Sequence, residues 1–321
     1  MGTLSHLPSS SRARLLRRRR IERLAWTQAG VLSRRQLYAA GVTRAEVRAN
    51  VRADRWRRVG RQSVCIHRGP LDQVARHWTA VFEAGPRAHL DAGSSLLAAG
   101  LEHFEMERIR VSVPRGARVW RSRGLDIRQT RRWDPDEVVH DPLPRTRNAV
   151  AAVRHALWAR SNKEAALVLS LTVQQGLATA EELGEAMLKV RRDKRRGFIH
   201  SVILDLLGGA TSLGELEVAA ECRRRGLPEP SRQVLRRGRR GKYYLDVLWD
   251  AWGVVVEIDG IHHSWVQNIV ADAVRHNDIA LTRKVVLRVP LLGLRLDAET
   301  FYAQIEQALR DGGWPGLSAS A

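Results

Sequence analysis

Three carboxylates fall on two neighbouring segments that the sequence predicts to be β-strands. Asp246 lies within Tyr243–Leu248, and Glu257 and Asp259 end the run VVVEID, which is rich in β-branched residues. Antiparallel pairing of the two segments would bring Asp246 close to Glu257, and Glu257 and Asp259 share a face because strand side chains alternate. Converging carboxylates repel one another unless a cation neutralises them, and oxygen ligands suit Mg²⁺ or Mn²⁺. The sequence therefore predicts a metal site formed by these three residues.

The elements predicted around the carboxylates follow the order α-β-β-β-α-β-α. The first helix runs from Leu213 to Arg225, and Glu217 borders its apolar stripe. The other predicted elements are strands at Gln233–Arg236, Tyr243–Leu248 and Val254–Asp259, a helix over Trp265–Arg283, a strand at Val285–Val289 and a helix from Asp297 to Arg310. This order places the carboxylates in the middle of a sheet.

Several short motifs accompany this order. They are GELE at Gly214–Glu217, the Asp246 strand, EIDG followed by His262-His263, the D-x-x-R-x-x-D pattern of Asp272, Arg275 and Asp278, and VVLRV at Val285–Val289. Together they resemble the PD-(D/E)xK, restriction-endonuclease-like superfamily, and within it a very-short-patch-repair-like endonuclease family of unknown function. The resemblance covers residues 213–310, about a third of the chain. Asp259 stands where that superfamily usually has Lys.

The resemblance implies a role for each polar residue near the carboxylates. Very-short-patch-repair enzymes also lack the Lys and use histidines after the metal strand, which implies His262 or His263 as the substitute that transfers a proton or orients water. Glu217 would order a metal-bound water. Arg275 would clamp the phosphate, and Asp278 would orient a histidine or pair with Arg275. A salt bridge on a helix surface is the alternative for Arg275 and Asp278.

The composition of the chain indicates what kind of partner it binds. Its 321 residues carry a formal net charge of +20, which predicts an anionic partner, with DNA the first candidate, although arginine-rich codon usage also contributes. Its two cysteines, Cys65 and Cys222, show no zinc-ligand spacing. No apolar run approaches membrane length. We therefore expect a cytoplasmic protein that needs Mg²⁺ or Mn²⁺ and no small-molecule cofactor.

Basic residues concentrate near the N-terminus, where residues 1–58 hold 15 Arg and three acidic residues. A helix is predicted from Leu15, a second is capped by Ser33 and a third by Thr43, and Arg55–Ile66 alternates like a two-stranded wing. This pattern predicts a winged helix-turn-helix. The predicted DNA-binding residues are Arg44, Arg48, Arg52, Arg55, Arg57 and Arg58. A winged helix that binds protein is the alternative.

The phrase LSRRQLYAAGVTRAEVRANVRADRWRRV, at residues 32–59, is similar to the winged-helix domain of abortive-infection type IV antitoxins. Three domains follow from these patterns: a winged helix at 1–70, a middle α+β domain at 71–207 and a nuclease-like domain with an αβββαβ core at 208–321. The fold class is therefore multidomain, α+β and α/β. The pattern favours a metal-dependent DNA endonuclease brought to DNA by the winged helix. The alternative is an antitoxin-like transcriptional regulator with a degenerate nuclease fold.

Overall fold

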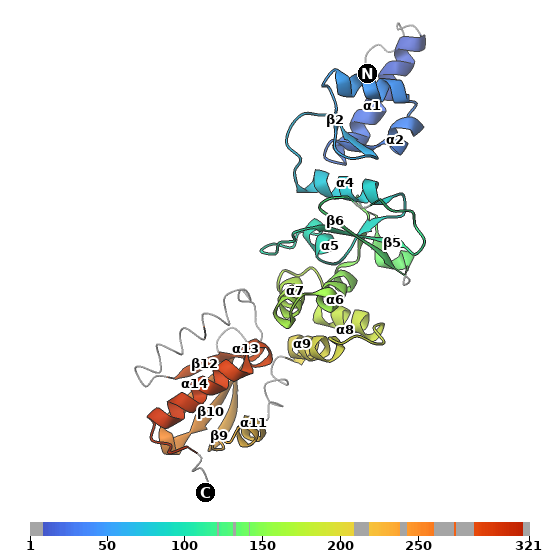
Figure 1. The fold of residues 1–321 in the computed structure, drawn as a ribbon. Helices are drawn as coiled ribbons and strands as arrows, with labels where there is room; N and C mark the ends of the chain where they lie inside the picture. The colour runs from blue at the N-terminus through green and yellow to red at the C-terminus, as the bar shows by residue number, and fades with distance from the viewer. Residues whose placement is uncertain are drawn as a thin grey trace. The chain divides into compact units, whose positions relative to one another are not determined.

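The computed structural model describes residues 9–120, 122–130, 133–140, 142–208, 218–237, 243–259, 273 and 286–316. These residues form a mixed α+β structure with three sheets (Figure 1). The chain divides into two compact units, residues 1–151 and 152–321. The finer division into three domains that the sequence suggests stays a prediction. Across the described part of the chain, no helix combines the length and apolarity needed to cross a membrane.

The N-terminal helices begin where the sequence places their caps. Helix α1 spans Ser9–Trp26, α2 spans Arg34–Ala39 and α3 spans Arg44–Arg52. Ser33 and Thr43 each accept a hydrogen bond from the backbone N–H three residues on, while Gln36 and Glu46 return a bond to the cap backbone. These reciprocal capping boxes satisfy N–H groups that a helix cannot pair internally. Both predicted helix starts are therefore confirmed.

A three-stranded antiparallel sheet completes this segment. Strand β1 spans Val31–Ser33, β2 spans Arg57–Arg58 and β3 spans Ser63–Cys65, in the order β1-β3-β2. The predicted hairpin of β2 and β3 is present, and β1 is an additional strand that was not predicted. Helix and strand side chains share one core of Ile21, Ala25, Leu32, Leu37, Val42, Val47 and Val64. Burial of this apolar surface holds the three helices on the sheet.

Residues 73–146 build a five-stranded sheet with two helices. Helix α4 spans Gln73–Ala84 and α5 spans Ala92–Ala98. The strands are β4 (His89–Leu90), β5 (Ile109–Pro114), β6 (Leu125–Thr130), β7 (Val138–Val139) and β8 (Arg145–Thr146), in the order β6-β5-β4-β8-β7. The sequence predicts strands around Ile109–Val113, Val119–Trp120 and Leu125–Arg128; the first and third are present, and the second is wrong because Val119 and Trp120 have no regular structure. Trp78 of α4 shares a core with Val31 of β1 and Cys65 of β3.

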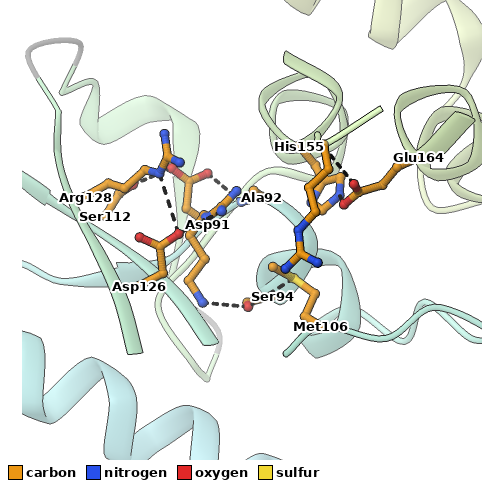
Figure 2. A network of polar contacts seen from close by, with 11 residues as sticks. Asp91, Ala92, Ser94, Met106, Ser112, Asp126, Arg128, His155 and Glu164 are labelled. Carbon is orange, nitrogen blue, oxygen red and sulfur yellow. Dashed lines mark hydrogen bonds and ion pairs between the residues drawn. The ribbon is translucent and has the colours of Figure 1, made fainter. Parts of the chain in front are cut away.

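A buried carboxylate ties this sheet together (Figure 2). Asp91 accepts hydrogen bonds from the Ala92 N–H at 2.7 Å, the Ser112 hydroxyl at 2.6 Å and the Thr146 hydroxyl at 2.9 Å. These donors come from α5, β5 and β8. These hydrogen bonds satisfy the buried carboxylate and connect α5, β5 and β8.

Four helices follow the middle sheet. They are α6 (Asn148–Trp158), α7 (Asn162–Gln174), α8 (Ala180–Leu188) and α9 (Arg196–Gly208). The sequence predicts helices near Asn148–Arg160, Lys163–Gln175 and Thr179–Arg192, which α6, α7 and α8 match, whereas α9 is not predicted. Helix α7 is packed by small and apolar residues such as Ala165, Val168 and Leu169. His155 and Glu164 form an ion pair at 3.0 Å between α6 and α7 (Figure 2).

The C-terminal sheet has four described strands in the order β12-β11-β10-β9. They are β9 (Arg232–Arg237), β10 (Tyr243–Trp249), β11 (Val254–Asp259) and β12 (Leu287–Pro290). β9, β10 and β11 are antiparallel neighbours, while β12 runs parallel to β11. The described helices are α11 (Val218–Arg224), α13 (Leu291–Leu296) and α14 (Ala298–Asp311). Helix α13 was not predicted.

One face of this sheet carries the core. Leu245, Val247, Trp249, Val256, Ile258, Leu287 and Val289 pack with Phe301, Ile305 and Leu309 of α14 and Val218 and Cys222 of α11. The β10–β11 connection ends at Gly253, whose φ of +62° lies in the left-handed region that favours glycine. This turn sets the strand register and so decides which residues face away from the core.

Ion pairs of Arg225 join α11 and α14, the two helices that cover the core. Arg225 Nε donates to Glu221 at 2.6 Å, and its terminal nitrogens donate to Glu299 at 2.7 and 2.8 Å. The Arg225 guanidinium also stacks 4.5 Å from the centroid of the Tyr302 ring. Hydrogen bonds from Arg224 and then Arg225 lower the pKa of Glu221 to about 2. The charges on Glu221 and Arg225 therefore stabilise the contact between α11 and α14 at neutral pH.

Candidate metal site and candidate nucleic-acid interface

The strand register places Asp246, Glu257 and Arg288 in one row across the C-terminal sheet. Asp246 of β10 is the direct partner of Glu257 of β11, and Glu257 is the direct partner of Arg288 of β12. Side chains opposite each other in an antiparallel pair have Cβ atoms about 4.5–5.5 Å apart and lie on one face. The predicted convergence of Asp246 and Glu257 is therefore present in the backbone.

The row lies on the face away from the apolar core. Along β11, Val254, Val256 and Ile258 are buried, while Glu257 is 35% exposed. The same alternation along β10 leaves Asp246 between the buried residues Leu245 and Val247. A sheet with one apolar and one polar face is the expected outcome of period-two alternation. Asp246 and Glu257 are thus fixed by packed strands, and both side chains are partly exposed.

Arg288 supplies a positive charge beside these carboxylates. Its Nε lies 3.3 Å from an Oε of Glu257, and its side chain is 68% exposed. The sequence interpretation gave Arg288 no role, although a charged residue inside the apolar run VVLRV was a usable signal. Only the parallel pairing of β12 with β11 shows that this arginine adjoins Glu257.

The donor chemistry fits a divalent ion. Two carboxylates on adjacent strands provide hard oxygen ligands of the kind that Mg²⁺ and Mn²⁺ prefer, and the next residue on that face of β11 would be Asp259, which ends the strand. Its side chain lies outside the described part of the structure, as do the predicted site residues Glu217, His262, His263, Arg275 and Asp278. Within the described residues, no group of three or more His, Cys, Asp or Glu is placed to hold a metal ion.

The predicted DNA-binding arginines lie on two adjoining elements of the N-terminal segment. Arg44, Arg48 and Arg52 follow one another at intervals of four along α3, so they share one face of that helix. All three are exposed, as are Arg55 and Arg58. This arrangement forms a basic surface on a helix that begins at the capping box of Thr43.

Arg55 and Arg57 also form hydrogen bonds with nearby residues. Arg57 is half-buried, and it donates to the Gly69 carbonyl at 2.9 Å, which holds the guanidinium against the chain. Arg55 Nε donates to Asn50 at 2.8 Å and remains exposed. Of the six, Arg57 therefore has the clearest structural role, and the face of Arg44, Arg48 and Arg52 has the clearest access.

The acidic residues of this segment are paired with other arginines. Arg17 contacts Glu46 at 2.6 Å, Arg18 contacts Glu22 at 2.8 Å, and Arg68 contacts Asp54. These three pairs account for every acidic residue in residues 1–58. None of the pairing arginines belongs to the predicted DNA-binding set. The positive charge of the α3 face is therefore not cancelled locally, which favours an anionic partner.

A further aromatic and cationic contact lies beside the hairpin of β2 and β3. The Arg61 guanidinium is 4.5 Å from the centroid of the Trp120 ring, and Trp120 is 62% exposed. Glu83 of α4 holds the hairpin turn, since it accepts hydrogen bonds from the Arg61 and Gln62 N–H groups and from the Ser63 hydroxyl. The sequence held no signal for this contact, because it joins segments about 60 residues apart.

Comparison with known proteins adds no family: no protein-family model matches the chain, and no curated protein matches it in sequence.

Proposed function

We propose that this chain is a metal-dependent DNA endonuclease, in which a restriction-endonuclease-like sheet carries the catalytic carboxylates and a basic winged helix binds duplex DNA. The observation that supports it best is the cross-strand row of Asp246, Glu257 and Arg288 on the polar face of a four-stranded sheet. The uncompensated arginine face of α3 supplies the affinity for phosphate. The proposal keeps the predicted αβββαβ core and the predicted winged helix.

Asp246 and Glu257 would hold Mg²⁺ or Mn²⁺, with Asp259 available as a third ligand. A bound divalent ion lowers the pKa of a coordinated water so that hydroxide is accessible near neutral pH. Arg288, which adjoins Glu257, provides the positive charge that the residue at position 259 does not. His262 or His263 transfers the proton, Arg275 contacts the phosphate, and Glu217 and Asp278 orient their neighbours, as the resemblance implies.

Nicking of a supercoiled plasmid with Mg²⁺ or Mn²⁺ tests the proposal. Wild type is expected to nick only with metal, and Asp246→Asn is expected to lose activity. Asp250→Asn is the matched control, because Asp250 is an exposed carboxylate one residue beyond β10. DNA affinity, followed in parallel, is expected to be equal in all three proteins.

A second readout isolates metal binding from cleavage. Ligands that bind the folded state raise the melting temperature, so Mn²⁺ is expected to stabilise wild type and Asp250→Asn but not Asp246→Asn. Salt-dependent DNA binding without metal-dependent nicking, and with no stabilisation by either ion, would support the alternative, a DNA-binding regulator. Nicking that survives Asp246→Asn would overturn the site assignment.

A further inference from the structure

A cavity of about 900 Å³ is lined by residues between positions 59 and 125, none of which belongs to either proposed site. Residues of α4, the end of α5 and the segment 101–107 line it. Ser94 and Met106, which face each other in Figure 2, are two of the lining residues. The volume is within the range of about 300–1,000 Å³ that is usual for small-ligand sites.

One lining residue is a buried histidine without a partner. His77 of α4 is 3% exposed, and no hydrogen bond or ion pair joins it to another described residue. Burial lowers its pKa to about 4, so the imidazole is neutral at physiological pH and offers one donor and one acceptor nitrogen. Neither nitrogen of His77 is among the fully buried, unpaired side-chain atoms of the described residues, so the imidazole is accessible from the cavity. A ligand group that both donates and accepts, such as an amide, would pair with it.

The rim of the cavity carries charges of both signs. Arg76 and Arg123 are exposed lining residues, and neither forms an ion pair within the described part of the chain. Glu105 is likewise exposed and has no described partner. The rest of the lining includes the apolar residues Leu97, Leu101, Phe104, Ile109 and Leu125. The lining therefore combines an apolar body, a hydrogen-bonding imidazole and charged side chains of both signs, which also include Glu83, Glu102 and Glu107.

We propose that this cavity binds a short peptide that has apolar side chains and free amino and carboxyl ends. A peptide amide pairs with the His77 imidazole, the terminal carboxylate lies against Arg76 and Arg123, and the terminal ammonium lies against Glu105. Apolar side chains cover the lining residues that water now contacts, which contributes the hydrophobic part of the affinity. The inference is independent of the nuclease proposal, because it uses none of the same residues.

Titration of the full-length chain with the tripeptide Leu-Phe-Leu tests it, with calorimetry as the measurement. The same peptide acetylated at its amino end, or amidated at its carboxyl end, lacks one charge and is otherwise matched. Each cap is expected to weaken saturable binding about fivefold, the effect of one partly exposed charge contact. Absence of saturable binding by the uncapped peptide, or equal binding of all three peptides, would overturn the proposal.

Single and double variants test each proposed contact of the peptide separately. His77→Phe keeps an aromatic ring but has no donor or acceptor, and it is expected to weaken binding about tenfold. His77→Gln, which retains a donor and an acceptor, is expected to keep most of the affinity. Glu105→Gln is expected to remove the preference for a peptide with a free amino end. The double variant Arg76→Gln, Arg123→Gln is expected to remove the preference for a peptide with a free carboxyl end. His140→Phe, an exposed histidine outside the cavity, is the control.

Unchanged preferences in these variants would show that peptide binds elsewhere and would overturn the assignment. Folding is checked by melting temperature. His77→Phe removes a buried polar group that has no described partner, so the free variant is expected to melt at or above the temperature of wild type. Weaker binding by a variant that melts normally therefore supports the direct contact, and tight binding by His77→Phe contradicts it.

Discussion

The N-terminal three-stranded segment and the C-terminal four-stranded sheet use charged residues in opposite ways. In the first, each acidic residue up to position 58 pairs with an arginine, and the α3 arginines remain on an open face. In the second, two carboxylates are direct cross-strand partners and one arginine adjoins them. A positive surface attracts the phosphates of a nucleic acid along its length. Two adjacent carboxylates repel each other and therefore favour the binding of one cation beside them. The comparison predicts that binding and cleavage are separable.

The largest effect is expected for Glu257→Gln. Loss of a metal ligand removes several kcal/mol of transition-state stabilisation, so nicking is expected to fall by about 10³-fold or more. DNA affinity is expected to stay within about twofold, because the phosphate contacts are assigned to α3. The nicking rate is measured on a supercoiled plasmid, and the DNA affinity is measured by a binding titration.

Glu306→Gln is the control for that variant, because Glu306 is a partly exposed carboxylate of α14 that pairs with Arg310 at 2.7 Å. It removes the same charge from the same unit and is expected to leave nicking unchanged. Equal losses in Glu257→Gln and Glu306→Gln would mean that general charge, and not the cross-strand row, governs activity.

Histidine substitutions rank second. His262→Ala or His263→Ala is expected to lower nicking by about 10²–10⁴-fold if that residue transfers the proton, and to leave affinity and stabilisation by Mn²⁺ unchanged. A plot of nicking rate against pH should also lose the step that a group titrating near neutrality produces in wild type. Wild-type rates in both variants would exclude proton transfer by these residues and leave the carboxylate assignment standing.

The salt dependence of DNA binding tests the role proposed for the arginines of α3. Replacing Arg44 and Arg48 with Gln is expected to reduce the slope of log affinity against log salt by about 2, since each phosphate contact contributes about 0.9. The matched control replaces Arg18 and Arg68, which are already paired with Glu22 and Asp54. A similar change of slope in both double variants would show that net charge alone determines binding.

The smallest effect concerns stability of the C-terminal unit. Hydrogen bonds from Arg224 and Arg225 depress the pKa of Glu221 to about 2, below its unfolded value of about 4.3. This contribution is complete above the unfolded pKa and is lost as the pH falls towards 2. Glu221→Gln is expected to lower the melting temperature by about 2–4 °C at pH 7 and by less near pH 2.5. An equal loss at both pH values would exclude a charge-dependent contact.

Local sequence signals determined much of the secondary structure. The capping residues Ser33 and Thr43 begin helices as predicted, because a cap depends only on residues three positions away. Alternation along Val254–Asp259 likewise predicted a strand with Val255 and Glu257 on one face; that this face points away from the core is shown by the structure. Short elements were missed where local signals are weak: β1, which exists only by pairing with β3, and the six-residue helix α13.

Partners far apart in the chain were decided by tertiary structure. The sequence by itself placed Asp246 beside Glu257, because a tight turn between adjacent strands leaves few possible registers. It did not place Arg288 beside Glu257 or His77 in a cavity. Those positions depend on which strands pair in parallel and on how a helix packs against distant loops, and both are set by the burial of apolar surface across the whole unit. Residue type and spacing thus determined the chemistry available to this protein, and packing decided which groups meet.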